Sequence, residues 1–149
     1  MADTLILACG SCRVKNRIPI ARLGEKPACG KCGHPLPLEN LGKVIQVTDA
    51  TFEQEVMQSG LPVLVDCWAP WCGPCRSMAP VFDALAQKYR ARLKVVKVNV
   101  DENTGTGSRF SISSVPTLLL VKGGRVKETL LGALPREQVE VAIERLIRN

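Results

Sequence analysis

The sequence predicts an α/β protein in which a mixed central sheet is flanked by helices, with a small metal-binding module in front of it. From about residue 44 onward, strand-like and helix-like patterns alternate and close with a hairpin and a helix, the order expected for a mixed sheet covered on both faces. The first 40 residues instead have scattered glycine and proline and two Cys-x-x-Cys pairs. We therefore divide the chain into a zinc-binding module, 1–40, and an α/β domain, 41–149.

The composition is typical of a soluble globular protein. Hydrophobic residues make up 46% of the 149 and charged residues 23%, and no apolar run has the length of a membrane span. The net charge of +6 is uneven, since residues 1–40 hold six Lys or Arg against three Asp or Glu. Four thiolates holding one divalent ion would cut that local charge of +3 to about +1, so a nucleic-acid partner is not expected.

Cysteine use points to metal binding and redox chemistry. Six of the seven cysteines form three Cys-x-x-Cys pairs. The N-terminus has only a short apolar run with no basic residue before it, unlike a secretory signal. We therefore expect an uncleaved cytoplasmic chain, where paired cysteines bind metal or do redox work more often than they form structural disulfides.

The first two pairs predict one structural zinc ion. Cys9 and Cys12 are separated by sixteen residues from Cys29 and Cys32, and each pair can form a tight turn that presents two thiolates. Four thiolates complete a tetrahedral site and leave no open position for metal catalysis. His34, the single histidine, is interpreted as a turn residue. A segment this short needs the metal because it cannot bury a sufficient core. No organic cofactor is expected.

The α/β domain begins after a linker at residues 39–43. A short strand is predicted at 44–47. N-cap candidates at 48–51 then start a helix that runs through about Gln58 and is ended by Gly60. The apolar run 63–68 predicts a central strand buried on both faces.

A longer helix is predicted from near Cys72 to about Arg90, with a kink at Pro80. Alternating apolar residues predict a second central strand at 94–100. Residues 104–110 form at best a short helix, and two glycines favour a loop there.

The chain closes with a hairpin and a helix. Strands are predicted at 117–121 and 125–131, joined by a tight turn at Gly123-Gly124. Pro135 begins the final helix, whose apolar residues recur at helical spacing.

The third pair is predicted to carry the chemistry. Cys72 stands at the start of a helix, where unpaired backbone N–H groups and the helix dipole stabilise a thiolate. Gly73 adds no bulk and Pro74 fits the first helical turn. Cys75 lies about one turn further on the same face, close enough to form a disulfide. The sequence therefore predicts that Cys72 attacks a substrate disulfide and that Cys75 resolves the mixed disulfide.

Asp66 is the second candidate, because a carboxylate inside an apolar strand is costly to bury without a role. Burial would raise its pKa, which suits a group that takes the proton from Cys75. An Asp facing solvent at a strand edge is the alternative. Lys97, in the next strand, could face Asp66 and tune it, or it could be an exposed lysine on an alternating strand.

The cysteine pair, Asp66 and several neighbouring segments together resemble a known protein family. The segments that carry the resemblance are Val63-Leu64-Val65-Asp66, Trp68-Ala69-Pro70-Trp71-Cys72-Gly73-Pro74-Cys75, Pro80, Lys97-Val98-Asn99-Val100-Asp101 and Val115-Pro116-Thr117. Residues from about 44 to 149 resemble a thioredoxin, and with the four-cysteine segment in front the whole chain is similar to the thioredoxin 2 type of bacteria.

The resemblance implies a thioredoxin fold for 41–149 and a protein-disulfide reductase activity, with Cys72, Cys75, Asp66 and Pro116 as catalytic residues. Taken alone, Pro116 is most often an ordinary trans proline, whereas the resemblance implies a cis proline beside the disulfide. The implied substrate-binding residues are Trp71, Gly73, Pro74, Val115, Gly132 and Ala133. The implied partners are disulfide-containing proteins and an NADPH-dependent thioredoxin reductase, and the protein is expected to be a monomer.

Other interpretations stay open from the sequence. Cys67 stands where thioredoxins commonly carry an aromatic residue, and we interpret it as a small buried hydrophobe, with oxidative regulation as the alternative. A thiol oxidase or disulfide isomerase shares the fold. In a third hypothesis the zinc segment itself is the functional part, as a binding module or as a redox sensor that ejects zinc.

Overall fold

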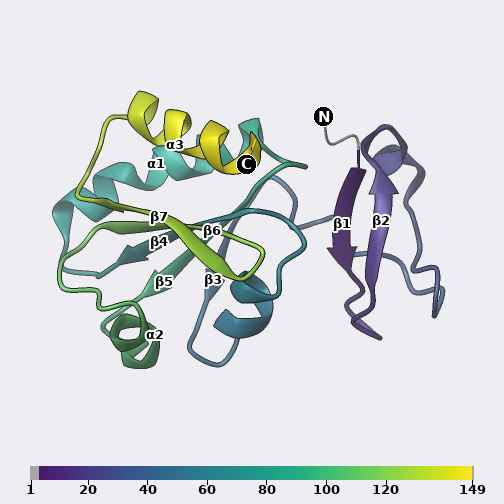
Figure 1. Cartoon of the computed structure of the whole chain (residues 1–149), viewed down its shortest axis with the longest axis horizontal. Helices are drawn as coiled ribbons and strands as arrows, with labels where there is room; N and C mark the ends of the chain where they lie inside the picture. Colours follow the sequence, from purple (N-terminus) through teal and green to yellow (C-terminus); the bar gives the residue numbers. More distant parts are fainter. Residues whose placement is uncertain (1–3, 149) are drawn as a thin grey trace.

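The computed structural model describes residues 4–148. The body of the molecule is a five-stranded sheet in the order β3-β5-β4-β6-β7 (Figure 1). Its strands are β3 (Val44–Val47), β4 (Val63–Trp68), β5 (Lys94–Asn99), β6 (Thr117–Lys122) and β7 (Arg125–Leu131). β5 pairs parallel with β3 and β4, whereas β6 pairs antiparallel with β4 and β7. The predicted mixed sheet is confirmed.

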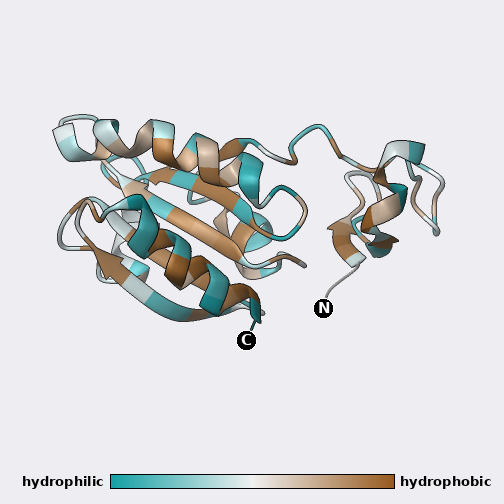
Figure 2. Ribbon diagram, turned by 90° about the horizontal axis from the view of Figure 1, so that it is seen from above, coloured by the Kyte–Doolittle hydropathy of each residue, from teal (hydrophilic) through white to brown (hydrophobic). Residues whose placement is uncertain are grey.

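Helices cover both faces of this sheet (Figure 1). α1 (Gly73–Lys88) and α3 (Arg136–Arg148) lie on one face, while α2 (Thr104–Arg109) and the short π-helix η2 (Glu53–Met57) lie on the other. A hydrophobic core lies on each face of the sheet, and central strand β4 contributes to both. Leu64 packs in the core with α1 and α3, and Val65 packs in the core with η2. Figure 2 shows largely apolar strands beneath α1 and α3, whose turns alternate between hydrophilic and hydrophobic residues.

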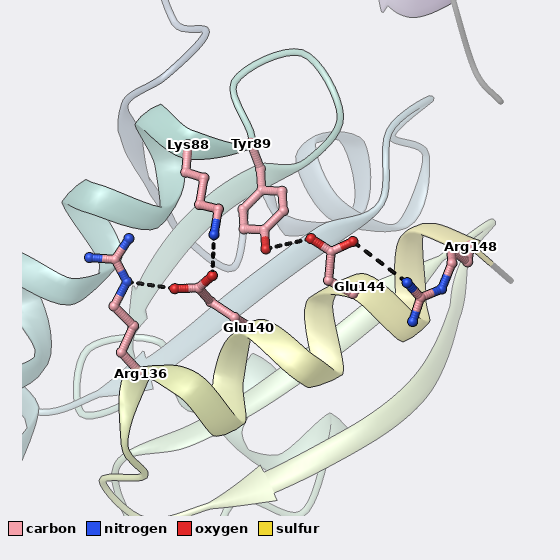
Figure 3. A network of polar contacts seen from close by, with 6 residues as sticks. All are labelled: Lys88, Tyr89, Arg136, Glu140, Glu144 and Arg148. Carbon is pink, nitrogen blue, oxygen red and sulfur yellow. Dashed lines mark hydrogen bonds and ion pairs between the residues drawn. The ribbon is translucent and has the colours of Figure 1, made fainter.

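A polar network fastens α3 to the end of α1 (Figure 3). The hydroxyl of the buried Tyr89 donates a hydrogen bond to Glu144 Oε2 at 2.8 Å. Glu140 accepts from Lys88 and from Arg136. Burial, followed by the hydrogen bond to Glu144, raises the pKa of Tyr89. The two helices on this face are therefore joined by directed polar contacts as well as by apolar packing.

The helix predicted to follow a cap at 48–51 and to run through about Gln58 is present, but it is a short π-helix and no threonine side chain caps it. The chain makes a turn in which Phe52 N–H donates to Thr48 O at 2.8 Å, and the helical part is the five-residue η2 alone. Its last bond runs from Gln58 N–H to Glu53 O, five residues back, as a π-helix requires. Thr51 Oγ1 accepts a hydrogen bond from Thr48 N–H at 2.9 Å, which stabilises this turn.

Residues 104–109 form the α-helix α2 although they contain two glycines. The carboxylate of Asp49, in the loop after β3, accepts hydrogen bonds from Gly105 N–H at 3.1 Å, Thr106 N–H at 2.8 Å and the Thr106 hydroxyl at 2.7 Å. The Thr106 hydroxyl, then its N–H, lower the pKa of Asp49. A cap supplied from a distant loop therefore stabilises a helix that its own sequence disfavours.

The other predicted elements of this region are present. α1 runs through Pro80 without interruption, and β6 and β7 form the predicted hairpin. Gly123 and Gly124 at its turn have φ of +60° and +76°, the pair of positive values that a type I′ turn requires.

The N-terminal segment contains a hairpin that the sequence did not predict. β1 (Thr4–Ala8) pairs antiparallel with β2 (Lys15–Pro19), and a 3-10 helix, η1 (Ile20–Glu25), follows. Strands this short show too few alternations to stand out in a sequence. The small core of the segment consists of Cys9, Ile18, Cys29 and Leu36. Half of that core is cysteine, so its packing and its metal site depend on each other.

This segment docks on the end of the sheet where β4 begins and α1 ends, as Figures 1 and 2 both show. A Cβ placed on Gly60 would lie 2.5 Å from Ile6 Cγ2 and 2.9 Å from Ile6 O, so only glycine allows this close approach. A cavity of about 300 Å³ lies at the junction, between residues of β1, the linker and the end of α1.

Within residues 4–148, none of the helices has the length and apolar character needed to span a membrane.

Candidate functional site: a redox pair and a four-cysteine cluster

Cys72 and Cys75 are joined by a disulfide, with their Cα atoms 5.3 Å apart. Cys72 is the N-cap of α1: its backbone is extended, and its Sγ accepts a hydrogen bond from Cys75 N–H at 3.1 Å. Pro74 occupies the first turn of the helix, where its missing N–H leaves no bond unmade. A sulfur at this position points into the positive end of a 16-residue helix, an arrangement that stabilises a Cys72 thiolate once the disulfide is reduced.

Asp66 lies behind this pair and is 5% exposed. Because Trp68 packs against Cys72 and Cys75, and side chains two apart on a strand share a face, Asp66 lies on the same side of the sheet as the disulfide. Burial raises its pKa to about 7, and the charge of Lys97 acts in the opposite direction. Lys97 is paired with Asp66 in the β4–β5 register. Of the two expectations for Lys97, the structure therefore agrees with the one in which it faces Asp66.

Asp66 Oδ1 is buried and has no hydrogen-bond partner in the described part of the chain. A buried carboxylate charge is costly, and protonation removes that charge. The site therefore contains a carboxyl group that can exchange a proton near neutral pH beside a redox-active disulfide.

The peptide bond between Val115 and Pro116 is cis, as the resemblance implied and as the residues alone did not. Val115 O lies 3.8 Å from Cys72 Sγ. Gly132 N–H donates to Pro116 O at 2.9 Å, which brings the end of β7 beside this loop. Exposed Ala133 follows Gly132. The structure thus gathers the residues of three separate segments around the disulfide.

Trp71, immediately before Cys72, is 70% exposed. Its indole N–H donates to Asp101 Oδ2 at 2.9 Å. The sequence assigned no role to Asp101, because nothing in the spacing of an exposed aspartate after β5 indicates that it meets a tryptophan thirty residues earlier.

The second site is the four-cysteine cluster. The sulfurs of Cys9, Cys12, Cys29 and Cys32 all lie within 4.8 Å of one another, and the Cys9–Cys32 and Cys12–Cys29 pairs are 3.6 Å apart. Four sulfurs arranged tetrahedrally at 2.3 Å from a central zinc ion would be separated by about 3.8 Å. The donor set and its spacing therefore fit a zinc ion with all positions filled by protein. His34 is not part of the cluster.

Backbone and side-chain donors surround these sulfurs. Ser11 N–H donates to Cys9 Sγ at 3.3 Å and Lys31 N–H to Cys29 Sγ at 3.4 Å. Asn16, from β2, donates its amide to Cys29 Sγ at 3.5 Å and accepts from Gly30 N–H at 2.9 Å. The N–H of Cys32, above all, lowers the pKa of Cys29 to about 6. The donors to Cys9 and Cys29 favour the thiolate, the form in which cysteine binds metal. Asn16 was not identified from the sequence.

Cys67 lies in neither site. Its side chain is fully buried on the opposite face of the sheet from the disulfide, among Val65, Val96 and Val98. Burial, with a smaller contribution from the charge of Asp66, raises the pKa of Cys67 to about 12. It is a buried apolar thiol in a site that does not favour reactivity.

Comparison with known proteins agrees with this geometry. Residues 43–145 match the family described as Thioredoxin. The chain belongs to the thioredoxin family. Its residues 8–34 match a second family, described as Thioredoxin 2, N-terminal, whose model is that of a zinc ribbon.

Proteins named thioredoxin are close relatives of its C-terminal part. The chain is 53% identical over 100 residues to "Thioredoxin 1" of Nostoc sp., an alignment that covers 67% of this chain and 94% of that protein. It is 58% identical over 90 residues to "Thioredoxin 1" of Synechococcus elongatus, covering 60% and 84%. A thioredoxin of Haemophilus influenzae is 48% identical over 99 residues, covering 66% and 92%. The protein is thus a thiol-disulfide oxidoreductase with a thioredoxin domain and a four-cysteine N-terminal region.

Proposed function

We propose that this thioredoxin reduces disulfide bonds in other proteins, with Cys72 as the nucleophile and Cys75 as the resolving thiol. The observation that carries the proposal is the position of Cys72 as N-cap of α1, with Cys75 N–H donating to its sulfur. The Cys72 thiolate attacks one sulfur of the substrate disulfide, a mixed disulfide forms, and the other substrate sulfur leaves as a thiolate that takes up a proton. Cys75 then attacks Cys72 Sγ, the substrate thiolate leaves, and the Cys72–Cys75 disulfide remains.

Asp66 is proposed as the base for the second step. The Cys75 thiol must lose its proton before it attacks, and the buried carboxylate on the same side of the sheet can accept it. A pKa of about 7 leaves this group able both to take up and to return a proton near neutral pH. Lys97 limits the rise in the pKa and so keeps a useful fraction of Asp66 ionised.

The substrate is proposed to lie against the exposed surface around the disulfide as an extended strand. Trp71, Val115 and Pro116 provide that surface, with Gly132 and Ala133 at its edge. Gly73 and Pro74 leave the approach to Cys72 free of bulky side chains. Electrons return to the disulfide from an NADPH-dependent thioredoxin reductase, and the reaction takes place in the cytoplasm. The protein acts as a monomer.

The N-terminal segment is proposed to bind one structural zinc ion through Cys9, Cys12, Cys29 and Cys32, with residues 1–40 as its module and 41–149 as the thioredoxin domain. The close fit of the sulfur spacing to a tetrahedral site supports zinc. The ion would hold together a core of only four buried residues, and it supplies no catalytic step because no ligand position is open.

The replacement C72S tests the function. We expect it to abolish catalytic reduction of a protein disulfide with dithiothreitol as the electron source, since serine is a far weaker nucleophile. C67A is the matched control, because it removes a cysteine of the same strand-helix unit on the opposite face, and it should keep the wild-type rate. Catalysis by C72S at more than a few per cent of that rate would disprove the proposal, and a strongly oxidising reduction potential would favour a thiol oxidase.

A further inference from the structure

Trp71 is the largest exposed apolar side chain of the described residues, and it adjoins the nucleophile. A long side chain on a surface normally samples several rotamers, and it loses that freedom when a partner binds. Here the indole is held before any partner arrives, because its N–H donates to Asp101 Oδ2 at 2.9 Å. The exposed ring of Trp71 therefore has a fixed orientation in the free protein.

Asp101 is itself held by the loop that follows β5. Its N–H donates to the side-chain oxygen of Asn99 at 3.0 Å, and Asn99 is only 4% exposed. The Asn99 amide donates to Glu102 Oε1 at 3.1 Å. Asn103 donates to Asn99 O at 2.9 Å, which closes the turn. The carboxylate that meets Trp71 thus projects from a turn whose own polar groups are paired.

This turn is also joined to the strand that leads to the redox pair. Val100 N–H donates to Trp68 O at 3.0 Å, at the end of β4. Directly after β4, Cys72 N–H donates to Ala69 O at 3.1 Å and starts the turn into α1. The loop after β5 and the segment before Cys72 therefore form one connected unit, and the Trp71–Asp101 bond closes it on the solvent side.

From this geometry we infer that Asp101 is a positioning residue: it fixes the Trp71 ring in the orientation in which that ring contacts protein substrates. The inference rests on the proposed function, and it adds the residue that sets the orientation of the contact surface. The loss of Asp101 leaves the sulfurs and Asp66 in place, so it acts on substrate binding, which KM reports, more than on the chemical step.

The test is a double-mutant cycle with D101A and W71F, measured as KM and kcat for reduction of a protein disulfide with dithiothreitol as electron source. D101A should raise KM by roughly threefold to tenfold, the effect of having to fix one freed side chain when the substrate binds, with little change in kcat. Phe lacks the indole N–H, so adding D101A to W71F should have no further effect. D101N retains an acceptor oxygen and should recover most of the lost affinity.

A second measurement reports the motion of the Trp71 ring itself. Nanosecond fluorescence anisotropy of Trp71, obtained as the difference from W71F, should show faster ring motion in D101A and near-normal motion in D101N. D83A removes an exposed carboxylate on α1 and should change neither readout. Additive effects of D101A and W71F, or unchanged ring motion in D101A, would overturn the inference. Failure of the wild-type protein to reduce the disulfide would instead reject the proposed function, and the anisotropy would still report on Asp101.

Discussion

The replacement of Asp66 by Asn tests the electrostatics of the redox site through protein stability. Burial raises the pKa of Asp66 from 3.8 to about 7, with Lys97 opposing the rise. Between these values the folded protein holds a proton that the unfolded chain has released. The stability that this group contributes is therefore fully present below the unfolded pKa, and it is lost as the pH rises through the folded value.

The magnitude follows from the size of the shift. Each pH unit over which the folded protein holds one extra proton changes the free energy of unfolding by about 1.4 kcal/mol, so the full shift corresponds to about 4 kcal/mol. Asparagine does not titrate. The stability advantage of D66N over the wild type should therefore grow by about 2 kcal/mol from about pH 5.5 to about pH 8 and then level off.

Urea unfolding of the oxidised, zinc-loaded protein between about pH 5.5 and pH 8.5 measures this difference. The disulfide keeps Cys72 and Cys75 from titrating, and the comparison of two variants cancels the contribution of other groups. D83N, which changes an exposed carboxylate of α1, is the matched control and should track the wild type within about 0.5 kcal/mol. An advantage of D66N that is the same at every pH would show that Asp66 does not titrate in this range, and the argument for it as the base would fail.

Three other outcomes are expected. Y89F removes the hydrogen bond to Glu144 shown in Figure 3 and should lower the free energy of unfolding by about 1–2 kcal/mol. A loss below about 0.3 kcal/mol would mean that this bond adds nothing to stability. Removal of zinc by a chelator should abolish amide-exchange protection in the β1–β2 hairpin and leave that of the large sheet; unchanged protection would contradict a structural ion. G60A should displace Ile6 and make the linker more sensitive to protease while disulfide reduction continues, whereas G24A, at a glycine with open space around it, should behave as wild type. Equal sensitivity of G60A and wild type would contradict the docking contact.

The parts of the fold that the sequence predicted well are those fixed by local patterns. The apolar run of β4, the helix that starts at Cys72 and the two glycines of the β6–β7 turn each have a signal within a few residues. The parts that it missed depend on distant partners. Asp49 caps α2 from more than fifty residues away, and the β1–β2 hairpin is stabilised by a cysteine core that forms only when four separated thiols meet.

The same distinction applies to the candidate site. Asp66 could be singled out because a carboxylate among valines is a local anomaly, and its burial is confirmed. The cis form of the Val115–Pro116 bond has no local signature, since tertiary contacts choose the isomer. Asp101 and Asn16 are ordinary polar residues in the sequence, and they become informative only when the fold brings them to Trp71 and to Cys29.

The three Cys-x-x-Cys pairs show why spacing alone does not determine chemistry. Cys9 and Cys29 each begin a tight backbone turn. The sulfurs of the two pairs all lie within 4.8 Å of one another, so all four can bind one ion. The Cys72–Cys75 pair stands alone at the start of α1, at the end of the domain away from the N-terminal segment. α1 has 16 residues and spans about 24 Å, and the N-terminal segment lies beside its far end, so the disulfide and the four-cysteine cluster are separate sites. One protein can therefore hold a closed metal site and a reactive dithiol built from the same motif, because the fold keeps the two at opposite ends of a helix.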